Sequence, residues 1–370
     1  MNKFSLQLLL AMLFLVSNAI AQKTEIKWHN PATEKYPTVH NQGWSDKEIK
    51  SFYDRLPSKM ENTVRPEVWN LSRTAAGLEL VFNTTAEQII IRYVTTKKKY
   101  AMNHFPATGV SGVDLFAENK DGSWAWANGK ADFKDTITYS YASLDLDKDQ
   151  YKSGRKFHLF LPLYNGVKWL EIGVPEGSGF KFIPVTDEKP IITYGTSITQ
   201  GGCASRPGMA WTNILSRKLH TPVVNLGFSG NGKLEKEIID LMAEKDAKIF
   251  IIDCVANMGA DIKNIKSKHT DAVITLRAKH PNTPIVVVEQ PHYTEGRFTS
   301  ARARGLAAMN KELQDSYKEL KSKGVKNVYY LTYADIGFDM NDSVDGTHPT
   351  DMGMLKYANA FEKLLKPLLK

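Results

Sequence analysis

The sequence predicts an α/β protein in two parts. An N-terminal antiparallel β-sandwich, jelly-roll-like, is followed by a C-terminal three-layer α/β/α domain, flavodoxin-like, with five parallel strands. The first half holds short segments rich in β-branched and aromatic residues, and the second half alternates strand-like with helix-like segments. Between them, residues 182–190 carry two prolines and several charges. We therefore expect domains at residues 22–186 and 187–370.

The first 21 residues have the order of a secretory signal peptide. Lys3 precedes an apolar run at residues 8–16, and small residues follow up to Ala21. The run is too short to span a bilayer comfortably, and no cysteine stands at the cleavage point before Gln22 that would take a lipid anchor. The sequence predicts an exported protein, periplasmic or secreted, that is soluble and not inserted in a membrane.

The N-terminal domain reads as a series of short strands separated by Gly, Asn, Asp and Lys, as in a sandwich. We expect these strands at residues 78–82, 89–94, 136–141, 157–161 and 169–174. One helix is expected, from Ser45 to Leu56, because Ser45 is a suitable N-cap and Glu48 stands at the capping-box position.

The C-terminal domain alternates regularly between strand and helix, which predicts a parallel sheet with helices on both faces. We expect strands at residues 191–194, 223–226, 248–254, 285–288 and 328–331, and helices at 210–219, 235–243, 264–280, 300–323 and 352–369. Ligands bind such sheets beyond the carboxyl ends of the strands. Ser197, Gly230 and Asn257 each follow a strand, so we expect them to converge.

The composition is that of an ordinary globular protein with a basic balance. The chain has 370 residues, 42% hydrophobic and 24% charged, with a formal net charge of +8. Removing the leader subtracts only Lys3 and leaves about +7. Basic residues are scattered, and the short cluster Lys97 to Lys99 has no nucleic-acid-binding motif beside it. We expect no nucleic-acid partner.

Two cysteines, Cys203 and Cys254, are too few for a disulfide scaffold. An oxidising compartment would permit a bridge if the geometry allows one. Cys203 follows the serine motif and Cys254 ends an apolar strand-like run, so both are expected near one edge of the sheet. A disulfide and two buried thiols remain open alternatives.

Two short motifs carry the chemistry. Residues 195–199 read Gly-Thr-Ser-Ile-Thr and supply a serine hydroxyl, and residues 345–348 read Asp-Gly-Thr-His and supply an imidazole with a nearby carboxylate. A serine hydroxyl becomes a good nucleophile when a neutral imidazole takes its proton, and the imidazole needs a partner on its other nitrogen. The motifs therefore predict a hydrolase with Ser197 as nucleophile, His348 as base and Asp345 as the orienting acid.

The order of these motifs resembles that of the SGNH (GDSL-like) hydrolases. Ser197, Gly230 and Asn257 fall in the first three blocks of that family, and Asp345-x-x-His348 follows the fourth. The resemblance covers the C-terminal half of the chain. It implies that Ser197 is the nucleophile, that Gly230 and Asn257 form the oxyanion hole, and that His348 is the base. The amide of Ser197 is expected to join that oxyanion hole.

The N-terminal half carries a second resemblance. Residues 112–116 read Gly-Val-Asp-Leu-Phe, which is similar to the Gly-x-Asp-Leu-Tyr motif of the β-domain that precedes some bacterial SGNH hydrolases. Two positions depart from the family pattern. Thr196 stands where many relatives have Asp, and the third block reads Val-Ala-Asn-Met around Asn257 rather than Gly-x-Asn-Asp. Neither departure removes a proposed catalytic group.

Simpler interpretations exist for the same residues. The serine and the asparagine are common caps of helices and turns, and the glycine is a common turn residue without dinucleotide-loop spacing. Asp345 and His348, with His292, could hold a metal, but no further ligands follow at a tight spacing. The Gly-x-Ser-x-Gly pattern of the α/β-hydrolases fails at Thr199. We predict no cofactor and no metal site.

The function predicted is that of a secreted serine esterase. It would remove small acyl groups, such as acetyl, from a glycan whose bulk the β-domain could hold. One alternative is a lipid-directed esterase, a lysophospholipase or a relative of platelet-activating-factor acetylhydrolases, which would prefer long acyl chains. Another is a non-catalytic glycan-binding protein, against which the intact serine, aspartate and histidine argue. The sequence leaves the glycan, the acyl group and the oligomeric state open.

Overall fold

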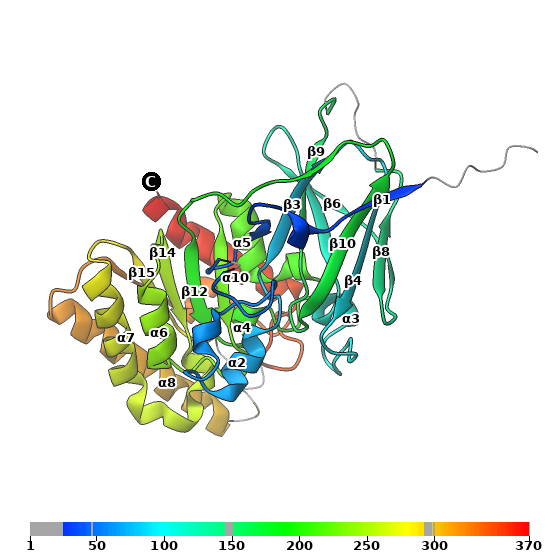
Figure 1. Cartoon of the computed structure of the whole chain (residues 1–370). Coiled ribbons are helices and arrows are strands. Elements are labelled where there is room, and N and C mark those ends of the chain that lie inside the picture. Colours follow the sequence, from blue (N-terminus) through cyan, green and yellow to red (C-terminus); the bar gives the residue numbers. More distant parts are fainter. Residues whose placement is uncertain (1–24, 46, 145–150, 292–297, 299, 370) are drawn as a thin grey trace, which may run out of the picture.

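A computed structural model of the whole chain is shown in Figure 1, and the structure describes residues 25–45, 47–144, 151–291, 298 and 300–369. A pair of antiparallel sheets lies beside a parallel sheet with its helices. The predicted leader lies outside the described residues. Among the residues that are described, none of the helices combines the length and apolar character that a membrane crossing requires.

The N-terminal part is a β-sandwich, as predicted. Its strands are β1 (Ile26–His29), β2 (Val39–His40), β3 (Glu79–Thr84), β4 (Ile89–Thr95), β5 (Asp114–Glu118), β6 (Trp124–Ala127), β7 (Lys130–Asp132), β8 (Ile137–Tyr141), β9 (Arg155–Phe160), β10 (Val167–Pro175) and β11 (Phe180–Phe182). One sheet has the order β1-β10-β4-β8-β7, and the other has the order β11-β3-β9-β5-β6 with β2 beside β3. Alternate residues of β4 and β8 are buried, the period expected of strands with one face on a core. Ile91 of one sheet and Leu159 of the other belong to that core.

The C-terminal part is a three-layer α/β/α domain, also as predicted. Its strands are β12 (Ile191–Gly195), β13 (Val223–Gly227), β14 (Ile249–Asp253), β15 (Ile285–Val288) and β16 (Val328–Leu331). Its helices are α4 (Ser197–Gln200), α5 (Trp211–Leu219), α6 (Lys236–Ala243), α7 (Ile265–Lys279), α8 (Ser300–Ser322), α9 (Tyr333–Ile336) and α10 (Asp351–Leu365). The five strands are parallel in the order β13-β12-β14-β15-β16, which is the flavodoxin-like order. Helices α5 and α10 cover one face of the sheet, and α6, α7 and α8 cover the other (Figure 1).

The helix predicted from Ser45 to Leu56 is wrong. Glu48 does accept hydrogen bonds from the backbone N–H and the hydroxyl of Ser45, at 3.0 and 2.8 Å, but the chain continues in turns and the helix of this region is α2 (Pro66–Ser72). The segment lies between the two domains: Leu56 packs into the α/β core, whereas Tyr53 packs into the sandwich core. Burial on two sides overrides the local capping signal.

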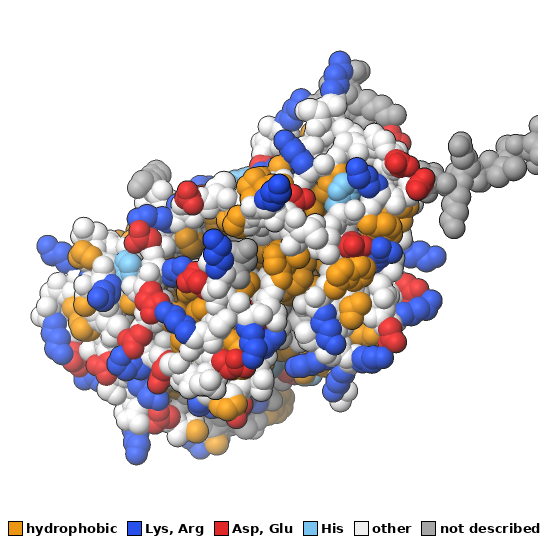
Figure 2. All heavy atoms as spheres, viewed as in Figure 1, with side chains coloured by type: hydrophobic (Ala, Val, Ile, Leu, Met, Phe, Trp, Pro, Cys, Tyr) orange, Lys and Arg blue, Asp and Glu red, His pale blue; other side chains and the backbone are white. Residues whose placement is uncertain are grey.

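The two domains share more than a linker. Trp44, Val68 and Trp69 precede most of the sandwich in sequence but lie in the α/β core. Phe105 and Leu163 of the sandwich pack in the second α/β cluster, next to Ile198. On the face of the molecule seen in Figure 2, basic and acidic side chains are interspersed, so the net charge of +8 is not gathered into one patch there.

Candidate active site

Ser197 lies in the turn that joins β12 to α4. The side chain of Thr196 caps α4, Ser197 is its first residue, and Gly201 ends it in the left-handed region with φ of 103°. Gly195 is required for this sharp turn, since a Cβ there would lie 2.1 Å from Oγ1 of Thr199. The turn places the serine beyond the carboxyl end of a central strand, where α/β sheets bind their ligands.

The structure brings Ser197, His348 and Asp345 into one hydrogen-bonded chain. Oγ of Ser197 lies 2.8 Å from Nε2 of His348, and Nδ1 of His348 lies 2.7 Å from Oδ2 of Asp345. Oδ1 of Asp345 also accepts from the backbone N–H groups of Thr347, at 3.0 Å, and His348, at 2.8 Å. Because a carboxylate accepts from Nδ1–H, the lone pair of Nε2 is left facing the serine hydroxyl.

The electrostatics of Asp345 fit this arrangement. Partial burial acts to raise the pKa of Asp345, but the hydrogen bonds from the His348 backbone and imidazole and from Thr347 outweigh it, so the pKa lies below its ordinary value. The group is therefore ionised at neutral pH. An ionised carboxylate stabilises the imidazolium that forms when His348 takes a proton.

Gly230 and Asn257 lie on loops that touch the nucleophile turn. Gly230 has φ of 69°, and a Cβ there would meet nothing within 4 Å, so the space that a side chain would fill is open. With the Asn257 amide assigned in the orientation that its surroundings favour, its oxygen accepts from the backbone N–H groups of Asn231, at 3.0 Å, and Gly232, at 3.1 Å, which leaves its NH2 group as a donor. Gly232 packs against the turn itself, since a Cβ there would lie 2.0 Å from the carbonyl oxygen of Gly195. The loops that carry Gly230 and Asn257 are therefore in contact with each other and with the nucleophile turn.

A buried arginine that no sequence motif indicated, Arg55, supports the loop that carries Gly230. NH1 of Arg55 donates to the carbonyls of Asn225, at 2.8 Å, and Gly227, at 3.0 Å, at the end of β13. Its Nε and NH2 donate to the carbonyls of Thr74, at 2.9 Å, and Leu71, at 2.8 Å. Burial lowers the pKa of Arg55 to about 9. The arginine thus ties the segment before the sandwich to the loop that carries Gly230.

Asp253 is a second buried group that the sequence motifs did not reveal. It ends β14, and its Oδ2 accepts from the hydroxyl of Thr199 at 2.9 Å. Burial raises the pKa of Asp253 to about 7, although the hydrogen bond from Thr199 acts in the opposite direction. The contact fixes the nucleophile helix to the neighbouring strand.

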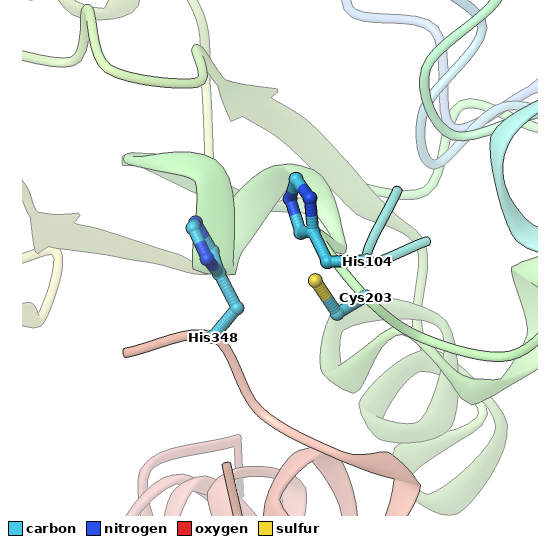
Figure 3. A group of neighbouring side chains, drawn as sticks. All are labelled: His104, Cys203 and His348. Carbon is cyan, nitrogen blue, oxygen red and sulfur yellow. The ribbon is translucent and has the colours of Figure 1, made fainter. Parts of the chain in front are cut away.

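The β-domain reaches the site directly. The hydroxyl of Tyr164 donates to the carbonyl of Ser197 at 3.3 Å, and Phe105 packs edge-on against Tyr164 with ring centroids 5.1 Å apart. The His104 ring lies 5.8 Å from the His348 ring, centroid to centroid (Figure 3). The nucleophile turn is therefore bordered by residues of both domains.

The cysteines are two buried free thiols, so the alternative of a disulfide does not apply. Cys203 lies beside the nucleophile turn, where burial and then the charge of Asp345 raise the pKa of its thiol to about 12. His292, the third candidate metal ligand in the sequence, lies outside the described residues.

The Gly-x-Asp-Leu motif of the sandwich has a structural role at the domain boundary. Asp114 is buried and accepts from Nε1 of Trp126 at 2.6 Å, from the guanidinium of Arg206, and from the backbone N–H of Gly208 at 2.9 Å. Gly112 admits no side chain, because a Cβ would lie 2.3 Å from the carbonyl oxygen of Thr108. The motif joins the sandwich to the segment that follows the nucleophile helix.

Both halves of the chain match known families. Residues 188–366 match the GDSL-like Lipase/Acylhydrolase family, and residues 26–180 match the N-terminus of Esterase_SGNH_hydro-type proteins. The C-terminal half of the chain therefore belongs to the GDSL-like lipases and acylhydrolases, and the N-terminal half is the domain found at the N-terminus of SGNH-type esterases. That family is one of ester hydrolases. No curated protein matches the chain.

Solved structures with the same architecture span both domains. A Bacteroides ovatus protein described as a GDSL-like lipase is 29% identical, with a TM-score of 0.84 over 93% of this chain and 98% of that chain. The salicylyl-acyltransferase SsfX3 from a tetracycline biosynthetic pathway is 18% identical, with a TM-score of 0.71 over 93% and 97%. The acetyl xylan esterase Est2A of the rumen bacterium Butyrivibrio proteoclasticus is 10% identical, with a TM-score of 0.52 over 93% and 99%. The last two structures show only that they share the fold of this chain.

Proposed function

We propose that this protein is an exported serine esterase that hydrolyses small acyl esters, acetyl esters above all, on a carbohydrate. The observation that carries the proposal is the hydrogen-bonded chain from Oγ of Ser197 through the His348 imidazole to Asp345. Nucleophile, base and orienting acid stand in the geometry that acyl transfer requires.

In the proposed reaction, Ser197 attacks the ester carbonyl while His348 takes its proton. The negative charge on the carbonyl oxygen is met by the amides of Ser197 and Gly230 and by the NH2 group of Asn257. His348 then gives this proton to the departing sugar oxygen, which leaves as a hydroxyl while the acyl group stays on Ser197. A water molecule, deprotonated by His348, attacks this acyl-enzyme and releases the acid. Asp345 stabilises the imidazolium in both halves of the cycle.

The surroundings of Ser197 favour a short acyl group. Ser197 is only 7% exposed. A Cβ on Gly202, behind the nucleophile, would lie 2.7 Å from the Tyr164 hydroxyl and 3.3 Å from Cδ2 of His348, so little free space remains on that side. A compact acyl group fits such a site while the alcohol part of the ester stays outside. The acetyl xylan esterase of the same fold supports a glycan as that alcohol.

Export and the domain division belong to the same proposal. A leader at residues 1–21 would be removed, the β-sandwich at residues 22–186 would hold part of the glycan, and residues 187–370 would carry the chemistry. N-terminal sequencing of the protein recovered outside the cytoplasm tests the first step, because the account expects the chain to begin at Gln22.

The test of function is acetate release from a panel of acetylated polysaccharides, with Ser197→Ala as the blank. A series of nitrophenyl esters from acetate to laurate is measured alongside. We expect acetate release from at least one glycan and a rate that falls as the acyl chain lengthens. Preference for laurate would favour the lipid-directed alternative. A folded protein that binds glycans but hydrolyses no ester in either set would refute the esterase.

A further inference from the structure

Three side chains that commonly bind metals meet beside the nucleophile. One nitrogen of His104, Sγ of Cys203 and one nitrogen of His348 all lie within 4.8 Å of one another (Figure 3). His104 comes from the β-domain, Cys203 from the turn after α4, and His348 from the loop before α10. Their wide separation in sequence explains why ligand spacing did not reveal the cluster.

We propose that His104, Cys203 and His348 form a binding site for Zn²⁺, and that the bound ion switches off ester hydrolysis by occupying Nε2 of His348. A thiolate with two imidazoles is a donor set that suits zinc rather than magnesium or calcium. This site goes beyond the proposed function, because the ion would act as an inhibitor and take no part in the reaction.

The geometry requires only a small adjustment. Zinc at about 2.0 Å from nitrogen and 2.3 Å from sulfur, in a tetrahedral arrangement, sets ligand atoms about 3.3–3.6 Å apart. The ligand atoms lie within 4.8 Å of one another, so the widest pair would have to close by up to about 1.2–1.5 Å to reach that spacing. His104 is exposed, so its ring is free to swing toward the other two. Cys203 and His348 are held more firmly.

His348 is already oriented as a zinc ligand. Histidines that bind zinc usually donate their other ring N–H to a carboxylate, which fixes the tautomer and strengthens the ligand. Asp345 does this for Nδ1 of His348 at 2.7 Å. The lone pair of Nε2 then has two possible partners, the hydroxyl of Ser197 at 2.8 Å and a metal ion. Only one can be engaged at a time.

The backbone of Cys203 gives a second, independent indication. Cys203 has φ of 72°, a left-handed conformation that residues other than glycine seldom adopt and that concentrates at functional sites. The thiol is buried. This backbone holds the sulfur at the edge of the site without any disulfide partner.

Zinc binding changes no oxidation state, so it needs no redox partner. The Cys203 thiol loses its proton to solvent, and the thiolate forms a bond to Zn²⁺. The imidazoles bind as neutral ligands, and water fills the fourth position. With Nε2 occupied, His348 cannot accept the proton of Ser197, so acylation stops. Removal of the ion by a chelator returns the lone pair and restores the base.

The first test uses Co²⁺ in place of Zn²⁺, because a thiolate bound to Co²⁺ gives a near-ultraviolet charge-transfer absorption that does not depend on activity. We expect wild-type protein to develop this absorption with one equivalent of Co²⁺ and to lose it when Zn²⁺ is added. Cys203→Ser should abolish the absorption, and the exposed His104→Ala should weaken Co²⁺ binding at least tenfold. Cys254→Ser, the other buried thiol, is the matched control and should behave as wild type.

The second test follows hydrolysis of nitrophenyl acetate during a Zn²⁺ titration. We expect inhibition that is reversed by EDTA, with at least a tenfold higher half-inhibiting concentration of Zn²⁺ in His104→Ala and Cys203→Ser than in the Cys254→Ser control. No thiolate absorption in the folded wild type would overturn the site. Equal inhibition of all variants would overturn the switch, because zinc would then act elsewhere. If the wild type does not hydrolyse nitrophenyl acetate, the Co²⁺ absorption alone decides whether the metal site exists. The missing hydrolysis would then count against the proposed esterase.

Discussion

Replacing Asp345 by asparagine keeps the size of the side chain but changes which nitrogen of His348 carries the proton. Asp345 accepts three hydrogen bonds: from Nδ1 of His348 at 2.7 Å, and from the backbone N–H groups of His348 at 2.8 Å and Thr347 at 3.0 Å. The amide oxygen of asparagine can keep the two backbone bonds. Its NH2 group then faces Nδ1 as a donor, which favours the tautomer protonated at Nε2. That tautomer has no lone pair for Ser197.

The size of the expected fall in kcat follows from the loss of the base while the loop keeps its structure. We expect kcat to fall by about 10³- to 10⁴-fold, or about 4–5.5 kcal/mol of transition-state stabilisation, with little change in KM. The free energy of unfolding should change by less than about 1 kcal/mol, since the backbone bonds survive.

The assay is steady-state hydrolysis of nitrophenyl acetate, with urea denaturation as the check on folding. Asp339→Asn is the matched control, because Asp339 is an acidic residue that precedes the same loop and pairs with Lys356 at 2.7 Å. The control should retain nearly full kcat. A kcat for Asp345→Asn within tenfold of wild type would show that the orientation of His348 does not depend on this carboxylate.

Three further predictions test the oxyanion site, the buried arginine and the buried acid. Asn257→Ala should lower kcat for nitrophenyl acetate by about 10²- to 10³-fold, because one oxyanion donor is lost; a change below threefold would exclude that role. Arg55→Met leaves four carbonyls, three of them buried, without their donor. We expect the free energy of unfolding in urea to fall by about 3 kcal/mol, offset in part because a charge is no longer buried. The matched change at an exposed arginine, Arg304→Met, should alter the free energy of unfolding by less than about 0.5 kcal/mol. The pKa of Asp253 in the folded protein, about 7, lies above its unfolded value of 3.8, so its stabilising contribution is full below about pH 4 and is lost as the pH rises to about 7. Urea midpoints should therefore show Asp253→Asn gaining stability relative to wild type between pH 5 and 7, by at most about 1.4 kcal/mol per pH unit, and a constant difference would contradict the raised pKa.

Much of the fold could be predicted because its segments repeat a simple burial pattern. Most residues of the parallel strands are apolar, and β15 and β16 have the predicted bounds. The segment from Ser45 to Leu56 could not be predicted, because its conformation depends on contacts with two domains at once. A capping signal is local, whereas that packing is not.

In the candidate site, too, some residues could be predicted from sequence motifs and others could not. The place of Ser197 could be predicted because its motif follows a strand end, whose position in a parallel sheet is fixed. His348 lies in the loop before α10, and its pairing with Ser197 follows from the chemistry of the two motifs rather than from a strand end. Arg55 and Asp253 stand outside those motifs, and their importance comes from burial that only the tertiary structure sets. The approach of His104 to His348 depends on how the sandwich docks, which no short motif encodes.

The central claim, that His348 activates Ser197, is tested most directly by fluorophosphonate labelling read out by peptide mass spectrometry. The account predicts a single adduct on Ser197 in the folded, metal-free wild type, no adduct in Ser197→Ala, and labelling slowed by orders of magnitude in His348→Ala. An adduct on another serine, or labelling of Ser197 at an unchanged rate in His348→Ala, would contradict it.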